Sequence, residues 1–253
     1  MNVEVPYSKS IAYPVFARIF KHKSSTYKFY WFLSIIESVE KGKNSVSKDE
    51  LFCRMIANAW FPIKYFKLSF GSQDNLNEII DFIIEKSHIN LNKNKNQIKK
   101  ELLNIDDDQI KKKIRLLDGN VPFKFLTPWF KVLPKEEIQK KSQENKTYSI
   151  YQLFDDKIIV NPNWFKYISD NAKVLKDYVY WNLASFIQKR NPTTPDIIHK
   201  LIKPMKRKTL TKQRKQFWDI YLKNTNARCI FTDELLDADD YQVDHFIPFS
   251  WVS

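Results

Sequence analysis

Apolar residues recur at helical spacing at the start of the chain. Residues 11–20 fit a helix with Pro14 in its first turn, where proline's fixed φ is tolerated. Residues 24–26 offer an N-cap for a second helix, 27–41, which Gly42 would close. Apolar side chains cover most of this helix, so we expect it to lie in the core rather than to form a base-stacking platform. These side chains are Phe29, Trp31, Phe32, Leu33, Ile35, Ile36 and Val39.

Two further helices are indicated by cap signals. Ser47 followed by Glu50 is a capping-box pattern, which opens a helix that we expect Pro62 to end. Asp74 caps a helix over 76–87, whose apolar residues share one broad face. Residues 92–113 are rich in Asn and Lys, and we interpret them as an exposed, mobile helical segment in preference to a DNA-gripping arm.

The middle of the chain mixes extended and helical patterns. Prolines punctuate the aromatic stretch 122–134, which predicts extended chain packed on the helical core. Residues 135–146 are charged and fit a loop or a short helix. Alternating residues 148–154, an acidic turn and the apolar run 158–160 predict a β-hairpin.

Helical patterns return after Asn161-Pro162. We expect amphipathic helices over 164–169 and 174–188, and a third that begins near Pro195. The predicted core residues of this region are Tyr178, Trp181, Leu183, Phe186 and Ile187. Together the patterns predict a mainly α fold with a small β component. Residues 1–203 would form a mainly helical domain, in which a sub-boundary could fall near 92–147.

Composition narrows the class of protein. The chain has 253 residues, 43% of them apolar, which is enough for one large or two ordinary domains. Its three glycines argue against nucleotide-cradling loops, and we expect no cofactor of that kind. No apolar stretch reaches the length of a membrane span and no signal peptide is visible, so we expect a cytoplasmic protein with no membrane partner. The sequence leaves protein partners unknown.

Basic charge suggests a polyanionic partner. The 42 Lys and Arg outnumber the 29 Asp and Glu, for a net charge of +13. The sharpest cluster lies in 203–215 and contains no acidic residue, so we predict that it grips phosphates instead of serving only as a solvated linker. No base-reading motif is present, so we expect duplex DNA to be bound with little sequence preference. The cluster is Lys203, Lys206, Arg207, Lys208, Lys212, Arg214 and Lys215.

The candidate catalytic residues lie near the end of the sequence. We expect a helix over 216–222 that leads into residues 229–232, which read as a short apolar strand. An acidic turn then leads to a second strand that begins at Tyr241. That strand delivers Asp244 and His245 into a loop that Pro248 stops. Hydrolysis of a phosphodiester needs an activated water and a cation near the leaving oxygen. An imidazole suits the first task, and a carboxylate suits a hard ion such as Mg²⁺.

This pattern resembles the HNH endonucleases, whose ββα-metal module opens with such a hairpin and an Asp-His dipeptide followed by an apolar pair, Pro and Ser. The resemblance is most specific in 243–250 and implies a catalytic role for His245 as general base and a metal-ligand role for Asp244. It implies a divalent metal, with Mg²⁺ as the expected ion. Zinc is not expected, because Thr232 stands where a second zinc-binding Cys would lie and Cys53 is far away in sequence.

Our first interpretation is therefore a bacterial-type HNH DNA endonuclease, with the basic linker and the opening hairpin of the nuclease module in 204–253. In that family, a following helix supplies an Asn and a further metal ligand. Residues 246–253 are too few for that helix, so we expect a truncated product of a longer gene or an inactive remnant. The alternatives are a catalytically dead nucleic-acid-binding protein and a helical protein-interaction domain.

Overall fold

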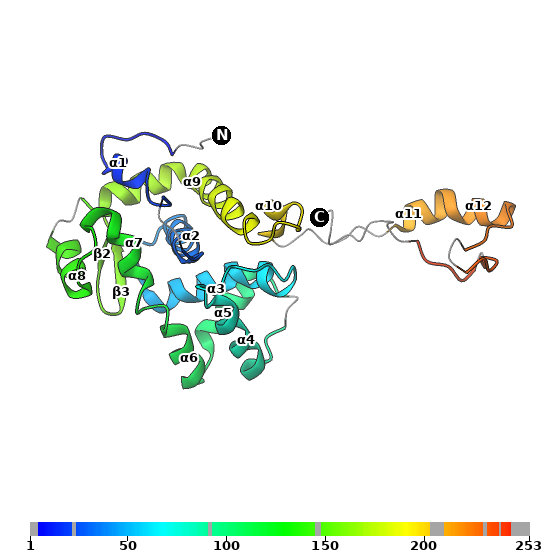
Figure 1. Cartoon of the computed structure of the whole chain (residues 1–253), viewed down its shortest axis with the longest axis horizontal. Helices are drawn as coiled ribbons and strands as arrows, with labels where there is room; N and C mark the ends of the chain where they lie inside the picture. The colour runs from blue at the N-terminus through cyan, green and yellow to red at the C-terminus, as the bar shows by residue number, and fades with distance from the viewer. Residues whose placement is uncertain are drawn as a thin grey trace. The chain divides into compact units, whose positions relative to one another are not determined.

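The chain forms two compact units, Met1–Lys203 and Pro204–Ser253. The structure is a computed structural model, and it describes residues 5–21, 24–90, 93–144, 148–202, 210–229, 232–237 and 239–243 (Figure 1). The fold is mainly helical with a small antiparallel sheet, as the sequence predicts. No helix within these ranges is long and apolar enough to cross a membrane.

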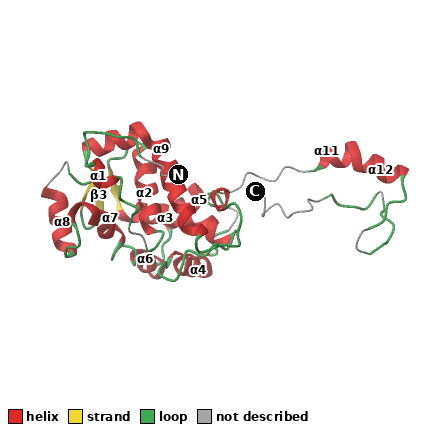
Figure 2. Ribbon diagram, turned by 45° about the horizontal axis from the view of Figure 1, so that its top comes forward, coloured by secondary structure: helices red, strands yellow, loops and turns green. Residues whose placement is uncertain are grey.

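Helix α2 (Tyr27–Val39) lies at the centre of the first unit. It packs between α3 (Lys48–Lys64) and α9 (Pro162–Gln188), and it also contacts α7 (Val121–Phe130) (Figures 1 and 2). Its predicted core residues are all buried, which confirms the prediction of an interior helix. Burial of apolar side chains is the dominant favourable term in folding, and the large aromatic residues of α2 bury much surface each.

The C-terminal end of α2 follows from local chemistry, and its N-terminal end is held by a contact distant in sequence. Gly42, just after the helix, has a φ of +74°, a left-handed conformation that glycine adopts without strain. At the other end, Thr26 does not cap the helix with its side chain. Its N–H and hydroxyl instead donate to one carboxylate oxygen of buried Asp74, at 2.7 and 2.6 Å. Asp74 thereby joins the start of α2 to the start of α4 (Leu76–Ser87).

The cap at Ser47 is confirmed, but the full capping box is not. The Ser47 hydroxyl accepts a hydrogen bond from the Glu50 N–H at 3.1 Å. The Glu50 carboxylate instead bonds the cations of Lys43, Arg54 and Lys99. The prediction that Pro62 ends α3 is wrong: the helix continues to Lys64. Proline breaks the backbone ladder, but the buried side chains around it hold the helix in place.

The sheet has the order β1-β3-β2. The predicted hairpin is present as β2 (Tyr151–Leu153) and β3 (Lys157–Val160). A third strand, β1 (Ser45–Ser47), was not predicted and pairs antiparallel with β3, with Val46 opposite Ile158. Tyr151 connects the sheet to helices α2 and α7. Its hydroxyl accepts a hydrogen bond from the Trp31 indole and donates one to the Pro122 carbonyl.

Two segments differ from the sequence prediction. The polar run 92–113 contains α5 (Lys95–Asn104) and the start of α6 (Asp108–Arg115), which pack on α3. Their apolar residues Ile98, Leu102, Ile110 and Ile114 are buried, so this is not an exposed segment. Likewise, residues 122–134 are not extended chain, because α7 occupies most of them and α8 (Lys135–Glu144) follows.

The long helix α9 replaces two predicted helices. It is continuous through residues 170–173, and Ile168, Ala172 and Leu175 are buried on its inner face. Of its predicted core residues, Trp181 is the exception, with 43% of its surface exposed. The helix expected near Pro195 is the single turn α10 (Ile197–Lys200), and short α1 (Tyr13–Phe16) has its proline in the first turn as expected.

Candidate functional site

The second unit is built on one interrupted helix. This helix consists of α11 (Thr211–Gln213), a π-helical turn η1 (Arg214–Trp218) and α12 (Asp219–Asn224). It therefore begins earlier than the helix predicted over 216–222. A π-turn inside a helix widens one turn and re-aims the side chains that follow. Here the turn brings Arg214 and Asp219 within 3.5 Å of each other.

Tyr241 is held against this helix by both of those residues. Its hydroxyl donates to the Asp219 carboxylate at 2.5 Å, and the Arg214 guanidinium lies 4.5 Å from the centre of its ring. The Tyr241 hydrogen bond, more than the neighbouring cation of Arg214, lowers the pKa of Asp219. The chain is thus fixed to the helix three residues before Asp244.

The expected hairpin is shorter than the sequence pattern suggests. Residues 227–229 and 232–236 lie against each other: the Cys229 N–H donates to the Glu234 carbonyl, and the Leu236 N–H to the Ala227 carbonyl. Arg228 and Leu235 form an isolated bridge. The return arm therefore begins near Glu234, and the described residues from Tyr241 to Val243 belong to no strand. Asp233, with a φ of +56°, permits this early turn.

The predicted catalytic pair, Asp244 and His245, lies outside the described residues. The same holds for Lys203, Lys206, Arg207 and Lys208 of the basic cluster. Lys212 and Lys215 are exposed on the described helix and form no ion pair with a described carboxylate. Arg214 does not have the free guanidinium expected of a phosphate ligand, because it contacts Asp219 and Tyr241.

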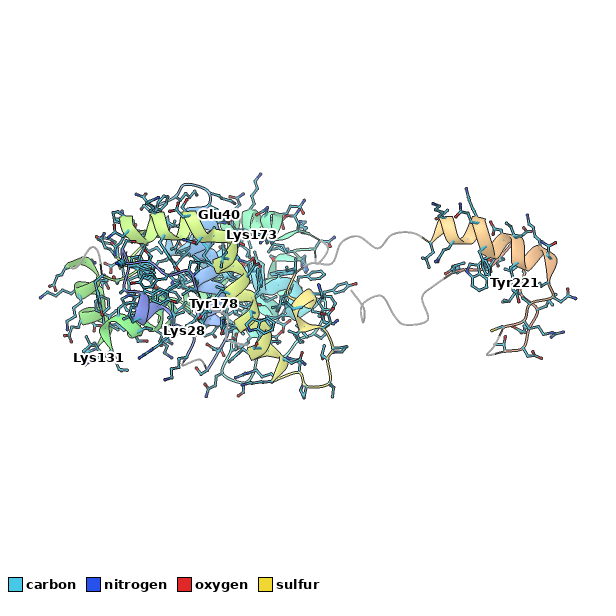
Figure 3. The ribbon with its side chains drawn as sticks, turned by 90° about the horizontal axis from the view of Figure 1, so that it is seen from above. Lys28, Glu40, Lys131, Lys173, Tyr178 and Tyr221 are labelled. Atoms are coloured by element: carbon cyan, nitrogen blue, oxygen red, sulfur yellow. The ribbon has the colours of Figure 1, made fainter. Side chains whose placement is uncertain are left out.

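Sequence reasoning missed an aromatic surface on the same helix. Phe217, Trp218 and Tyr221 are each at least 38% exposed, and the centres of the stacked Phe217 and Tyr221 rings lie 6.0 Å apart. Tyr221 is labelled in Figure 3. Leu222, on the same helix, is buried. The aromatic residues were visible in the sequence, but their exposure could not be deduced from spacing alone.

Metal-ligating groups do not cluster within the described ranges: no three His, Cys, Asp or Glu side chains lie close enough together to hold an ion there. Because Asp244 and His245 are outside those ranges, the expected Mg²⁺ ligand is not tested by this observation. Comparison with known proteins adds no assignment, since no family model, curated protein or solved structure matches the chain.

Proposed function

We propose that this protein is a metal-dependent DNA endonuclease of the HNH type. The observation that carries the proposal is the order of residues in 243–250, with adjacent Asp244 and His245 followed by an apolar pair, Pro248 and Ser250. The contact of Tyr241 with Asp219 and Arg214 supports it. A general base works only when its backbone is held in a defined position, and this contact fixes the chain just before the pair.

Each residue of the pair has a distinct task in the proposed reaction. His245 takes a proton from the water that attacks phosphorus, and the P–O bond to the leaving oxygen breaks. Asp244 would hold a divalent cation, whose positive charge would stabilise the negative charge that develops on the leaving oxygen. The basic residues of 203–215, with the exception of Arg214, bind backbone phosphates and hold the substrate without reading its bases.

The test is nicking of supercoiled plasmid by the full-length gene product. With Mg²⁺ present, we expect conversion to the open circle, and excess EDTA should abolish it. Equal nicking with and without EDTA would overturn the metal-dependent mechanism. Absence of nicking combined with salt-sensitive DNA binding would instead favour a nucleic-acid-binding protein without catalysis, which the one-signed charge of 203–215 also supports.

A further inference from the structure

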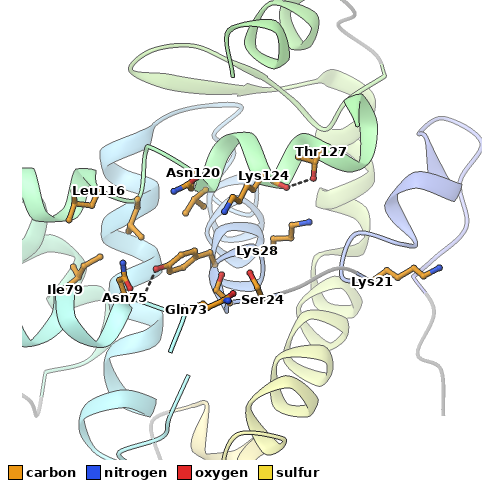
Figure 4. Close-up of a pocket in the computed structure, with 14 residues that line it drawn as sticks. Lys21, Ser24, Lys28, Gln73, Asn75, Ile79, Leu116, Asn120, Lys124 and Thr127 are labelled. Carbon is orange, nitrogen blue, oxygen red and sulfur yellow. Dashed lines mark hydrogen bonds between the residues drawn. The ribbon is translucent and has the colours of Figure 1, made fainter. Parts of the chain in front are cut away.

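A basic groove lies on the surface of the first unit, whereas the residues that suggested a nuclease belong to the second unit. Its deeper part is a cavity of about 730 Å³ between α2, α7 and the residues before α4 (Figure 4). Lys28 on α2 and Lys124 on α7 line it, together with the amides of Gln73, Asn75 and Asn120. Apolar side chains, among them Ile79 and Val121, also line it.

A second hollow, of about 570 Å³, continues the first. The two share Lys21, Lys28 and Thr127, and the second adds Arg18 and Lys131. Five basic side chains therefore line one groove, and no described acidic residue lines either hollow.

These cations are not neutralised from within the described chain. None of the five forms an ion pair or a hydrogen bond with a described carboxylate, whereas most lysines of α3, α5 and α6 do. Nearby Glu78 forms an ion pair with Lys113, and buried Asp74 accepts hydrogen bonds from Thr26 and Leu76. Burial, and then the neighbouring ammonium of Lys124, lowers the pKa of Lys28.

Unpaired like charges that converge on one groove are costly unless an anion binds between them. A small anion would satisfy Lys28 and Lys124 alone and would leave Arg18 and Lys131, in the second hollow, without a role. A polymer with regularly spaced phosphates can meet all five cations in turn. The amides of Gln73, Asn75 and Asn120 add hydrogen-bond donors of the kind that contact phosphate and sugar oxygens.

We propose that this groove of the helical unit binds the phosphate backbone of DNA. It gives the first unit a role separate from the basic cluster of 203–215. The proposal does not require that the protein be a nuclease, because binding precedes and can occur without hydrolysis.

The experiment measures binding of a short fluorescent duplex by anisotropy at several salt concentrations, with EDTA present and His245→Ala in every protein. Each phosphate contact contributes a slope of about −0.9 in log K against log salt. Lys28→Gln with Lys124→Gln should therefore make the slope less negative by about 1.8 and weaken binding at low salt by about 10-fold or more.

The matched control is Lys100→Gln with Lys173→Gln, which removes the same charge from exposed positions outside the groove (Lys173 is labelled in Figure 3). It should leave the slope unchanged. Arg18→Gln with Lys131→Gln, at two exposed positions of the second hollow, repeats the test without altering partly buried Lys28. Equal salt slopes for the parent protein, which carries only His245→Ala, and for both groove variants would overturn the proposal.

Calorimetric titration with inorganic phosphate and with ATP distinguishes a small ligand from a polymer. Tight ATP or phosphate binding that depends on Lys28 and Lys124, with DNA slopes unchanged, would also overturn it. Because EDTA and His245→Ala exclude cleavage, failure of the nuclease assay leaves this result interpretable.

Discussion

The hydroxyl of Tyr241 donates a hydrogen bond to Asp219 across 22 residues of sequence. With the cation of Arg214 against the Tyr241 ring, this contact is the point at which the segment leading to Asp244 meets the helix of its unit. It is only partly buried, so its contribution to stability is small. Its importance lies in position, because the proposed general base follows a few residues later.

Tyr241→Phe should therefore reduce plasmid nicking more than it reduces DNA binding. We expect a loss of roughly 10-fold in rate, since a displacement of about 1 Å can cost on the order of 100-fold and the ring contact with Arg214 persists. Tyr221→Phe is the control, because it removes a phenolic hydroxyl from the same helix. The Tyr221 hydroxyl forms no hydrogen bond among the described residues. Equal nicking rates for both variants would contradict a positioning role for Tyr241.

The basic linker makes a prediction about salt. Substitution of Lys206, Arg207 and Lys208 by Ala should weaken binding to every duplex alike, because backbone contacts carry no sequence information. If about four phosphates contact the linker, its share of the log K against log salt slope is roughly −3.6. Binding measured on unrelated duplexes should fall in parallel, and a loss confined to one sequence would indicate base readout instead.

Stability of the first unit should depend on pH through Glu50. Partial burial alone would raise the pKa of Glu50, but hydrogen bonds from Lys43, Arg54 and Lys99 lower it from 4.5 to about 2. A lowered folded-state pKa means that this stabilisation is complete above pH 4.5 and is lost as the pH falls towards 2.

Glu50→Gln should thus lower the free energy of unfolding by roughly 1.5–3 kcal/mol near neutral pH, because it breaks charge-assisted hydrogen bonds. The difference from the wild type should shrink in acid, where Glu50 is protonated. Urea denaturation of both proteins, near neutral pH and in acid, measures this difference in the free energy of unfolding. Glu40→Gln, which breaks a more exposed pair with Lys176, is the control and should cost about 1 kcal/mol or less. If the wild type and Glu50→Gln differed in stability by the same amount at every pH, the lowered pKa of Glu50 would not be the source of the stabilisation.

Cap residues and glycine located several helices correctly, because their effect is local. The cap at Ser47 and the left-handed Gly42 are where the sequence indicated. Helices α5 and α6, which were expected to be exposed but are packed, also carry local signals: Asn94 and Gln97 form a true capping box, and Asp107 caps α6. Their apolar residues at spacings of four were outweighed by the surrounding Lys and Asn.

Helix α7 could not be predicted from local rules, because Pro128 lies inside it. Proline has no N–H for the carbonyl four residues earlier, which is that of Lys124. The Thr127 hydroxyl donates to this carbonyl at 2.9 Å and replaces the missing bond. Such compensation depends on a side-chain rotamer and on packing of Phe125 and Trp129 in the core, and neither is readable from the proline alone.

In the second unit, the sequence indicated a helix and a fold-back, but not their extents. The acidic turn was assigned to the loop of a long hairpin, whereas the chain already reverses at Asp233. The contact between Tyr241 and Asp219 joins residues far apart in sequence through one hydrogen bond and leaves no periodic pattern to detect.

The central claim is that Asp244 and His245 act together on a phosphodiester, and the most direct test is the nicking rate of the full-length gene product as Mg²⁺ is varied. His245→Ala should abolish nicking at every concentration, and Asp244→Asn should raise the Mg²⁺ needed. The chain contains a matched pair, Asp196 and His199, whose carboxylate and imidazole lie 2.6 Å apart in the first unit. His199→Ala and Asp196→Asn should leave the curve unchanged, whereas nicking that survives His245→Ala, or is lost equally with His199→Ala, would contradict the account.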